Sequence, residues 1–238
     1  MYEERFYRNQ ILSKFKLEVS FKESDLLICS DSQIDKTKSQ DILIKYYQQI
    51  EEYINKNPLF LKSLSPLTGD QLAPPIIKEM LRSSEVTGIG PFSTVAGAIA
   101  QYVGAELLNY CQEIIVENGG DIFLKINQDK TLGVYLGQEF KIEKLNLKIK
   151  KRHQAFGIAS SSASLGHSLN FGKADLVSVV AKNVIIADGF ATAISNRIKR
   201  IEDVDKILAE AKDKFPIEGL LIAFGENIFL WGNLEVVN

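Results

Sequence analysis

The stretch Ala187-Asp188-Gly189-Phe190-Ala191-Thr192-Ala193 begins an apolar segment with the spacing of a helix. Asp188 and Thr192 are four residues apart, so both side chains lie on one face of that helix, one turn from each other. A carboxylate and a hydroxyl, with backbone carbonyls nearby, supply the oxygen ligands that Mg²⁺ takes in proteins. We therefore interpret Asp188 and Thr192 as metal ligands and Asp188 as a catalytic candidate.

The same segment also has a purely structural explanation. An acid in the first helical turn is stabilised by the helix dipole, and a threonine on a helix can hydrogen-bond to a carbonyl of the preceding turn. The functional interpretation is favoured because a second polar stretch, rich in serine, lies shortly before this segment in the chain.

That serine-rich stretch is Ser160-Ser161-Ser162-Ala163-Ser164-Leu165-Gly166-His167-Ser168, a loop expected after a short strand over 155–159. Serine hydroxyls and exposed amides can form a nest for an anion, although the composition also suits a flexible polar loop. His167 is a catalytic candidate, and a structural hydrogen-bonding role is the alternative for a lone histidine. A metal and a phosphate together indicate a nucleotide or dinucleotide ligand. The candidate phosphate contacts are Ser160, Ser161, Ser162 and Gly166.

Two further segments are candidates for contact with the same ligand. A helix is expected to begin within Gly90–Thr94, where free N–H groups and the positive end of the helix dipole attract anions. Tight helix packing explains most of the small residues that follow. The turn Asn118–Asp121 suits a plain hairpin, yet its two glycines also permit the close approach of a ligand. The candidate contacts are Ser93, Thr94, Asn118, Gly119, Gly120 and Asp121.

Apolar residues that alternate with polar ones predict strands, and apolar residues at helical spacing predict helices. Along the chain these patterns predict a group of strands, a group of helices, more strands, a pair of helices and two closing strands. Strands that follow each other directly are expected to pair as antiparallel hairpins, which favours an α+β layered fold over a doubly wound parallel one. Thr37 or Ser39 is the expected cap of the first helix, and Lys144–Arg152 is expected to form a solvated edge strand. Strands are expected at 17–21, 26–29, 113–117, 121–125, 133–136, 145–150, 155–159, 176–181, 218–224 and 227–232, and helices at 38–56, 74–88, 91–111, 184–198 and 202–213.

The composition limits the classes of function. The chain has 238 residues, of which 45% are hydrophobic and 24% charged, as in an ordinary globular protein, and we expect residues 1–238 to form one domain of two intertwined halves. A formal net charge of −2 argues against non-specific nucleic-acid binding. No apolar run is long enough to span a bilayer and no signal-peptide core is present, so a membrane partner is not expected. Cys29 and Cys111 form no CxxC motif, and we expect both to be reduced in a cytoplasmic protein.

These segments together resemble the ApbE-like superfamily, whose best-known members are the FAD:protein FMN transferases. Ala187–Ala193 is similar to the family's Ala-Asp-x-x-(Ala/Ser)-Thr-Ala metal motif, Asn118–Asp121 to its Gly-Gly-Asp/Glu turn, and Ala159-Ser160-Ser161 to its Thr-Ser-Gly loop. Gly90–Ala100 and Gly166–Asp175 resemble, more specifically, a cytosolic branch of ApbE-related prokaryotic proteins. The resemblance covers nearly the whole chain.

The resemblance implies an ApbE-like fold, a duplicated T-fold with antiparallel sheets packed against helices. It also implies FAD or FMN bound between sheets and helices, with Mg²⁺ at Asp188 and Thr192. In the transferases the metal polarises the pyrophosphate while FMN moves to a threonine of an acceptor protein. For this chain the resemblance therefore suggests a flavin or nucleotidyl transferase that meets a small-molecule nucleotide and an acceptor protein.

Two other functions stay open from the sequence. One comes from the resemblance, since some members of the cytosolic branch are linked to sulfide incorporation into homocysteine. In that role an iron–sulfur partner would hold the cluster, because the two cysteines of this chain are not spaced for one. The other is a non-catalytic assembly protein, which would act as an oligomer.

Overall fold

The computed structural model describes residues 13–135, 144–162 and 171–237. Two antiparallel sheets run through these ranges, one of eight strands and one of three. The large sheet contains β1 (Phe15–Phe21), β2 (Ser24–Ser30), β3 (Ile114–Asn118), β4 (Asp121–Lys125), β7 (Phe156–Ser161), β8 (Leu176–Ala181), β9 (Gly219–Phe224) and β10 (Asn227–Gly232), side by side in chain order. The small sheet contains β5 (Lys130–Tyr135), β6 (Lys144–Ile149) and β11 (Glu235–Val237), with β6 in the centre.

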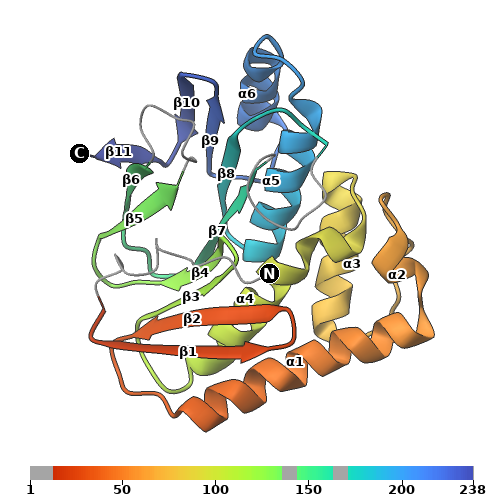
Figure 1. Cartoon of the computed structure of the whole chain (residues 1–238), viewed down its shortest axis with the longest axis vertical. Coiled ribbons are helices and arrows are strands. Elements are labelled where there is room, and N and C mark those ends of the chain that lie inside the picture. Colours follow the sequence, from red (N-terminus) through yellow and green to blue (C-terminus); the bar gives the residue numbers. More distant parts are fainter. Residues whose placement is uncertain (1–12, 136–143, 163–170, 238) are drawn as a thin grey trace.

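The helices are inserted between hairpins of the large sheet (Figure 1). The β1–β2 and β3–β4 hairpins flank the first helical group, and the β7–β8 and β9–β10 hairpins flank the second. The plan hairpin, helices, hairpin therefore occurs twice, which confirms the expected α+β class of antiparallel sheets packed with helices. The first group is α1 (Lys36–Lys56), α2 (Leu59–Lys62), α3 (Pro75–Thr87), the 3₁₀ turn η2 (Pro91–Thr94) and α4 (Val95–Leu107); the second is α5 (Val184–Arg197) and α6 (Asp203–Asp213).

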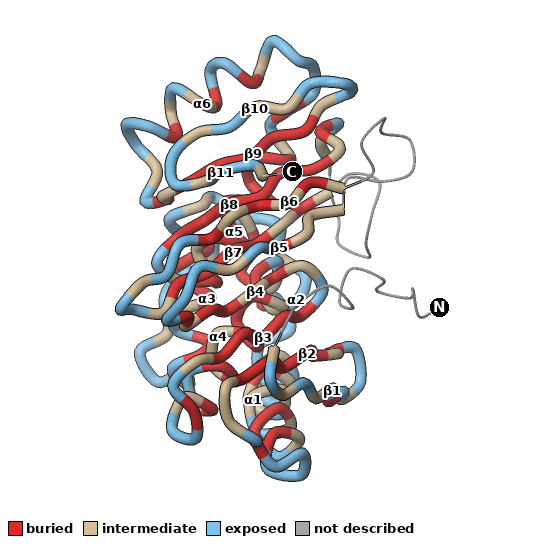
Figure 2. The backbone as a smooth tube through the Cα atoms, turned by 90° about the vertical axis from the view of Figure 1, so that its left-hand side faces the viewer, coloured by how far each residue is buried: buried red, intermediate tan, exposed pale blue. Residues whose placement is uncertain are grey.

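The large sheet is buried on both faces because alternate residues of its strands enter different cores. In β2, Leu26 and Ile28 pack with α1, α3 and α4, whereas Leu27 and Cys29 pack with the small sheet. A third cluster lies between α5, α6 and the strands β7–β9. Figure 2 shows these buried runs passing through the middle of the molecule. The expected single domain over residues 1–238 stays a prediction.

Local capping corrects two of the expected helix boundaries. Asp35, rather than Thr37 or Ser39, is the N-cap of α1, and its Oδ1 accepts the N–H of Lys38 at 2.8 Å. The helix expected over 91–111 is a 3₁₀ turn followed by α4, which ends at Leu107. Proline at the first position fixes φ without losing a needed N–H, so it can begin either type of helix, and the sequence alone does not distinguish them.

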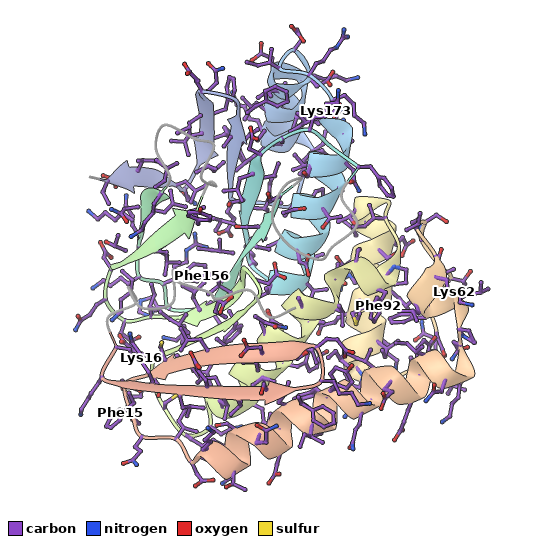
Figure 3. All side chains as sticks on the ribbon, viewed as in Figure 1. Phe15, Lys16, Lys62, Phe92, Phe156 and Lys173 are labelled. Atoms are coloured by element: carbon purple, nitrogen blue, oxygen red, sulfur yellow. The ribbon has the colours of Figure 1, made fainter. Side chains whose placement is uncertain are left out.

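Packing beyond the immediate neighbours corrects two further expectations. Lys144–Arg152 contains β6, which is the central strand of the small sheet rather than an edge strand, because β11 pairs with its outer side. Neither β11 nor the single turn of α2 was expected, and both are short elements held by contacts with distant segments. Phe60 of α2 meets the ring of Phe92 in η2 edge-on, with the centroids 6.4 Å apart. Figure 3 labels Phe92.

Within the part of the chain that the structure describes, no helix has the length and apolar character to cross a bilayer.

Candidate functional site

The first turn of α5 is held by side chains from its own cap and from α4. Asn183 precedes the helix, and its Oδ1 accepts the N–H groups of Ile185 at 2.7 Å and Ile186 at 3.3 Å. The N–H of Val184 donates to Oε1 of Gln101 on α4 at 3.0 Å. Because α5 begins at Val184, Asp188 lies in its second turn, not in the first turn that its structural explanation assumed.

The carboxylate of Asp188 reaches the N-terminus of α4. Its Oδ2 accepts the N–H of Gly97 at 3.0 Å, and Gly97 is the third residue of that helix. The N-cap residue Thr94 makes no capping bond, because its hydroxyl donates to the carbonyl of Pro91 at 3.0 Å. Asp188 thus performs from α5 the capping role that an N-cap side chain usually performs.

Gly97 allows this contact because it has no side chain. A Cβ at Gly97 would lie 2.9 Å from both Cβ and Oδ2 of Asp188. Real Cβ atoms do not come so close to other heavy atoms, so any larger residue would push α4 and α5 apart. The small residues of α4 therefore allow the tight helix packing expected for them. At Gly97 this packing also leaves room for the carboxylate of Asp188, the candidate metal ligand.

Burial raises the pKa of Asp188 to about 7, and the hydrogen bond from Gly97 lowers it only in part. Only 6% of Asp188 is exposed, and no basic side chain of the described residues contributes to its pKa. Thr192, one turn further along α5, is also buried. A buried carboxyl group without a compensating cation is costly to ionise, and such groups gather at functional sites.

The β3–β4 turn packs against the same end of α4. Asn118 pairs with Asp121, and Gly119 (φ 65°) and Gly120 (φ 102°) between them have left-handed backbones, which confirms the expected two-residue turn. The Nδ2 of Asn118 donates to the carbonyl of Ala96 at 3.1 Å. This hydrogen bond joins the turn to the residue next to Gly97.

Asn118 and Asp121 lie on the face of the sheet that the helices cover, because successive side chains of a strand point to opposite faces. Val116, two residues before Asn118, and Phe123, two residues after Asp121, both belong to the core under α1, α3 and α4. Asn118 and Asp121 are themselves buried. They therefore share the helical layer with Asp188.

The serine-rich stretch divides between the two faces of the sheet. Ser160 and Ser161 belong to β7 rather than to a loop. Ala159 packs with α5, so Ser161 points to the helical face by alternation. Ser160 points to the other face, where its hydroxyl lies 2.7 Å from that of Ser178. Ser160 therefore does not share a face with Asp188, and residues 163–168 of the expected phosphate loop lie outside the described residues.

The remaining candidates have mixed positions. Ser93 is exposed within η2, and its hydroxyl donates to the carbonyl of Gly90 at 2.6 Å. Ser162 follows β7 directly. Gly166 and His167 lie outside the described residues. The buried candidates on the helical side of the sheet are thus Thr94, Asn118, Asp121, Ser161, Asp188 and Thr192, and their ligand roles stay predictions.

The oxygen donors on α5 suit Mg²⁺ by their chemistry. Mg²⁺ keeps several of its waters and is usually bound through one or two carboxylates, so Asp188 with Thr192 is a sufficient protein contribution. In the described ranges no three His, Cys, Asp or Glu residues gather as a metal cluster.

Two hollows on the described surface lie away from these residues. One, of about 180 Å³, includes Cys29 and Lys130, and the other, of about 230 Å³, includes Tyr53 and Leu72. Neither contains Asp188, Thr192 or the β3–β4 turn.

The sequence did not single out Gln101, Asn183 or Glu79, which surround the first turn of α5. The Nδ2 of Asn183 donates to Oε2 of Glu79 at 3.1 Å, and Oε1 of Glu79 accepts the hydroxyl of Tyr102 at 2.9 Å. The available signals were the capping residue before Val184 and the position of Gln101 one helical turn after Gly97.

The fold has known counterparts among solved structures. Flavinyl transferase ApbE of Pseudomonas stutzeri matches with a TM-score of 0.61 at 12% identity, covering 93% of this chain and 96% of that one. The ApbE protein of Thermotoga maritima matches with a TM-score of 0.55 at 11% identity, covering 94% and 97%. At these identities the likeness concerns the fold, which is that of ApbE-like proteins.

Sequence comparison gives the family. A family model described as AbpE bacteria matches residues 8–214. UPF0280 protein MJ1526 of Methanocaldococcus jannaschii is 34% identical over 225 residues, which cover 92% of this chain and 91% of that protein. UPF0280 protein MMP1236 of Methanococcus maripaludis is 35% identical over 218 residues, covering 90% and 88%. The chain belongs to the ApbE-related family that the model defines.

Proposed function

We propose that this protein is a cytoplasmic enzyme that binds a flavin nucleotide, FAD or FMN, together with Mg²⁺, and transfers the flavin nucleotide to an acceptor protein. The observation that carries the proposal is the buried carboxyl group of Asp188, whose pKa burial raises to about 7 and which no basic side chain of the described residues offsets. A divalent cation carried by a nucleotide would supply the missing positive charge.

In this proposal each element of the site has one task. Asp188 and Thr192 hold the cation from one face of α5. Gly119 and Gly120 let the ligand approach the backbone of the β3–β4 turn, and Ser161 adds a hydroxyl from β7. A bound divalent cation withdraws negative charge from a pyrophosphate, which favours displacement at phosphorus.

The comparisons support the proposal through the activities named for the solved neighbours. The Pseudomonas stutzeri protein is a flavinyl transferase and the Vibrio cholerae protein a flavin transferase. Because identity to them is 12%, their activity supports a proposal for this chain and carries no residue-level assignment.

Calorimetric titration tests the proposal with four samples: FAD alone, Mg²⁺ alone, FAD with Mg²⁺, and ADP with Mg²⁺. We expect binding of FAD that depends on Mg²⁺, and loss of that dependence in Asp188→Asn. Asp35→Asn is the matched control, because Asp35 also accepts a backbone N–H, at the N-cap of α1, and asparagine caps equally well. If FAD fails to bind with or without Mg²⁺, the proposal is wrong. Equal binding of ADP and FAD would reduce it to a nucleotide site without a flavin preference.

Transfer is measured by mass spectrometry. The purified protein, FAD and Mg²⁺ are incubated with a panel of threonine-containing peptides, and a mass increase equal to bound FMN with release of AMP is expected on one class of peptide. In that step the threonine oxygen bonds to the flavin-side phosphorus, the bond to the AMP oxygen breaks, and the hydroxyl proton is lost to solvent or a base. AMP release without a labelled peptide would show hydrolysis rather than transfer.

A further inference from the structure

We propose that Gln101 is a positioning residue, which fixes the register of α5 against α4 and thereby places the carboxylate of Asp188. The geometry stands independently of the ligand, while the consequence for Mg²⁺ rests on the proposed function. Two hydrogen bonds, one at each end of a single helical turn, carry the inference.

The two bonds have matching spacing on both helices. The N–H of Gly97 donates to Oδ2 of Asp188, and the N–H of Val184 donates to Oε1 of Gln101, both at 3.0 Å. Gly97 and Gln101 are four residues apart on α4, and Val184 and Asp188 are four residues apart on α5. Since residues four apart share a helix face, the two bonds join the same two faces, and the helices run antiparallel between them.

Each helix therefore caps the other. Asp188 satisfies an N–H of the first turn of α4, and Gln101 satisfies the first N–H of α5. First-turn N–H groups have no partner within their own helix, so a side chain from a neighbour fixes where that helix begins. A shift of α5 by one residue would break both bonds together.

The sheet sets the depth of α5, and hydrogen bonds set its register. Besides the two bonds with α4, the hydroxyl of Ser83 on α3 donates to the carbonyl of Ile185 at 2.9 Å. A Cβ at Gly157 of β7 would lie 2.4 Å from Cα of Val184, so the backbone of α5 touches the sheet there. That contact prevents α5 from packing any closer to the sheet. Val184 therefore contacts β7 through its Cα and Gln101 through its N–H, and Asp188 follows one turn later on α5.

Gln101 has an alternative role as a purely structural partner that satisfies one N–H and has no effect beyond it. The two roles differ in what happens at Gly97, on the other hydrogen bond. In the positioning role, loss of the Gln101 acceptor weakens the Gly97–Asp188 bond. In the purely structural role, only the N–H of Val184 is affected.

The test uses Gln101→Met, which keeps a similar volume and removes the strong acceptor, and Gln101→Glu, which keeps an acceptor oxygen at the same reach. Tyr46→Phe is the matched control: it removes the hydrogen bond from Tyr46 on α1 to Oε2 of Glu106, elsewhere on α4. Amide hydrogen exchange is measured in metal-free protein, and Mg²⁺ is titrated calorimetrically in the presence of FAD.

In Gln101→Met the amide of Gly97 should exchange about tenfold faster or more, together with that of Val184, while Gln101→Glu and Tyr46→Phe keep the wild-type rate at Gly97. Mg²⁺ affinity should fall about tenfold to a hundredfold in Gln101→Met, the usual effect of removing a partner that orients a metal ligand, and should recover in Gln101→Glu.

Unchanged exchange at Gly97 in Gln101→Met, or an equal change in Tyr46→Phe, overturns the inference. If wild-type protein binds neither Mg²⁺ nor FAD, the proposed function fails, and exchange at Gly97 alone decides the positioning role. If Gln101→Met does not fold, the wild-type protein supplies the test: the amides of Val184 and Gly97 should have the same protection factor across a denaturant series, and separate protection factors overturn the inference.

Discussion

The backbone N–H of Gly97 donates to Oδ2 of Asp188 at 3.0 Å, although the two residues are 91 positions apart in the chain. One carboxylate therefore both completes the N-terminus of α4 and stands as the candidate metal ligand. The structural and functional interpretations of Asp188 are compatible, because a cap uses one carboxylate oxygen and a cation can be bound by the other.

Asp188→Asn should make the metal-free protein less sensitive to pH. The pKa of this carboxyl group is about 7 in the folded protein against a usual value of 3.8, so between pH 4 and 7 the folded state holds more protons than the unfolded state. The free energy of unfolding contributed by Asp188 therefore falls as pH rises through this range. Urea denaturation with EDTA at pH 5 and pH 8 should show Asp188→Asn gaining stability relative to wild type at the higher pH. A constant difference between the two proteins would contradict the assignment.

Gly97→Ala should destabilise the fold by about 1–3 kcal/mol, the usual effect of overpacking a close contact. The added Cβ would lie 2.9 Å from Asp188, so the two helices must separate and Mg²⁺-dependent FAD binding should weaken. Gly69→Ala is the control, because a Cβ there meets nothing within 4 Å. Thermal unfolding and FAD titration measure the two effects, and equal behaviour of both variants would refute the close-contact argument.

Ser160→Ala and Ser161→Ala should affect different properties. Ser161 lies on the helical face, so its loss should weaken FAD binding in the presence of Mg²⁺. Ser160 pairs with the buried hydroxyl of Ser178, so its loss should cost about 1 kcal/mol of stability and leave FAD binding unchanged. Titration and urea denaturation of both variants check this, and an effect of Ser160→Ala on FAD affinity would contradict the division of the serines between the two faces.

Both thiols should be inert in the native protein. Cys29 and Cys111 are buried, and burial together with the carboxylate of Asp31 raises the pKa of Cys111 to about 11. At pH 8 a thiol-specific disulfide reagent should react slowly with folded protein and rapidly with both cysteines in urea. Fast labelling of the folded protein would show that one of these cores opens readily.

Local signals in the sequence predicted the hairpins and the class of fold. Alternation identified the strands, and Gly119-Gly120 identified a tight turn, because both depend on residues next to each other in the chain. The division of Ser160 and Ser161 between faces could not be predicted with the same certainty, since a loop has no alternation and the end of β7 is set by its partner β8. The cap at Asp35 was missed because Thr37 and Ser39 are equally suitable by residue type.

The candidate site was predicted only in part for a related reason. Asp188 and Thr192 are four residues apart, so their proximity follows from helix geometry alone. The bonds of Asp188 to Gly97 and of Val184 to Gln101 join segments separated by 91 and 83 positions. Spacing along the chain carries no information about such pairs, and the packing of two helices determines them.

Reciprocal capping has a consequence for how the two halves of the molecule are made. The N-terminus of α4 belongs to the first half and depends on a carboxylate from the second, while the N-terminus of α5 depends on an amide from the first. During synthesis the first half leaves the ribosome before its partner acid has been translated. The duplicated plan therefore does not give two independent modules: a fragment that ends before β7 would contain α4 with a frayed beginning.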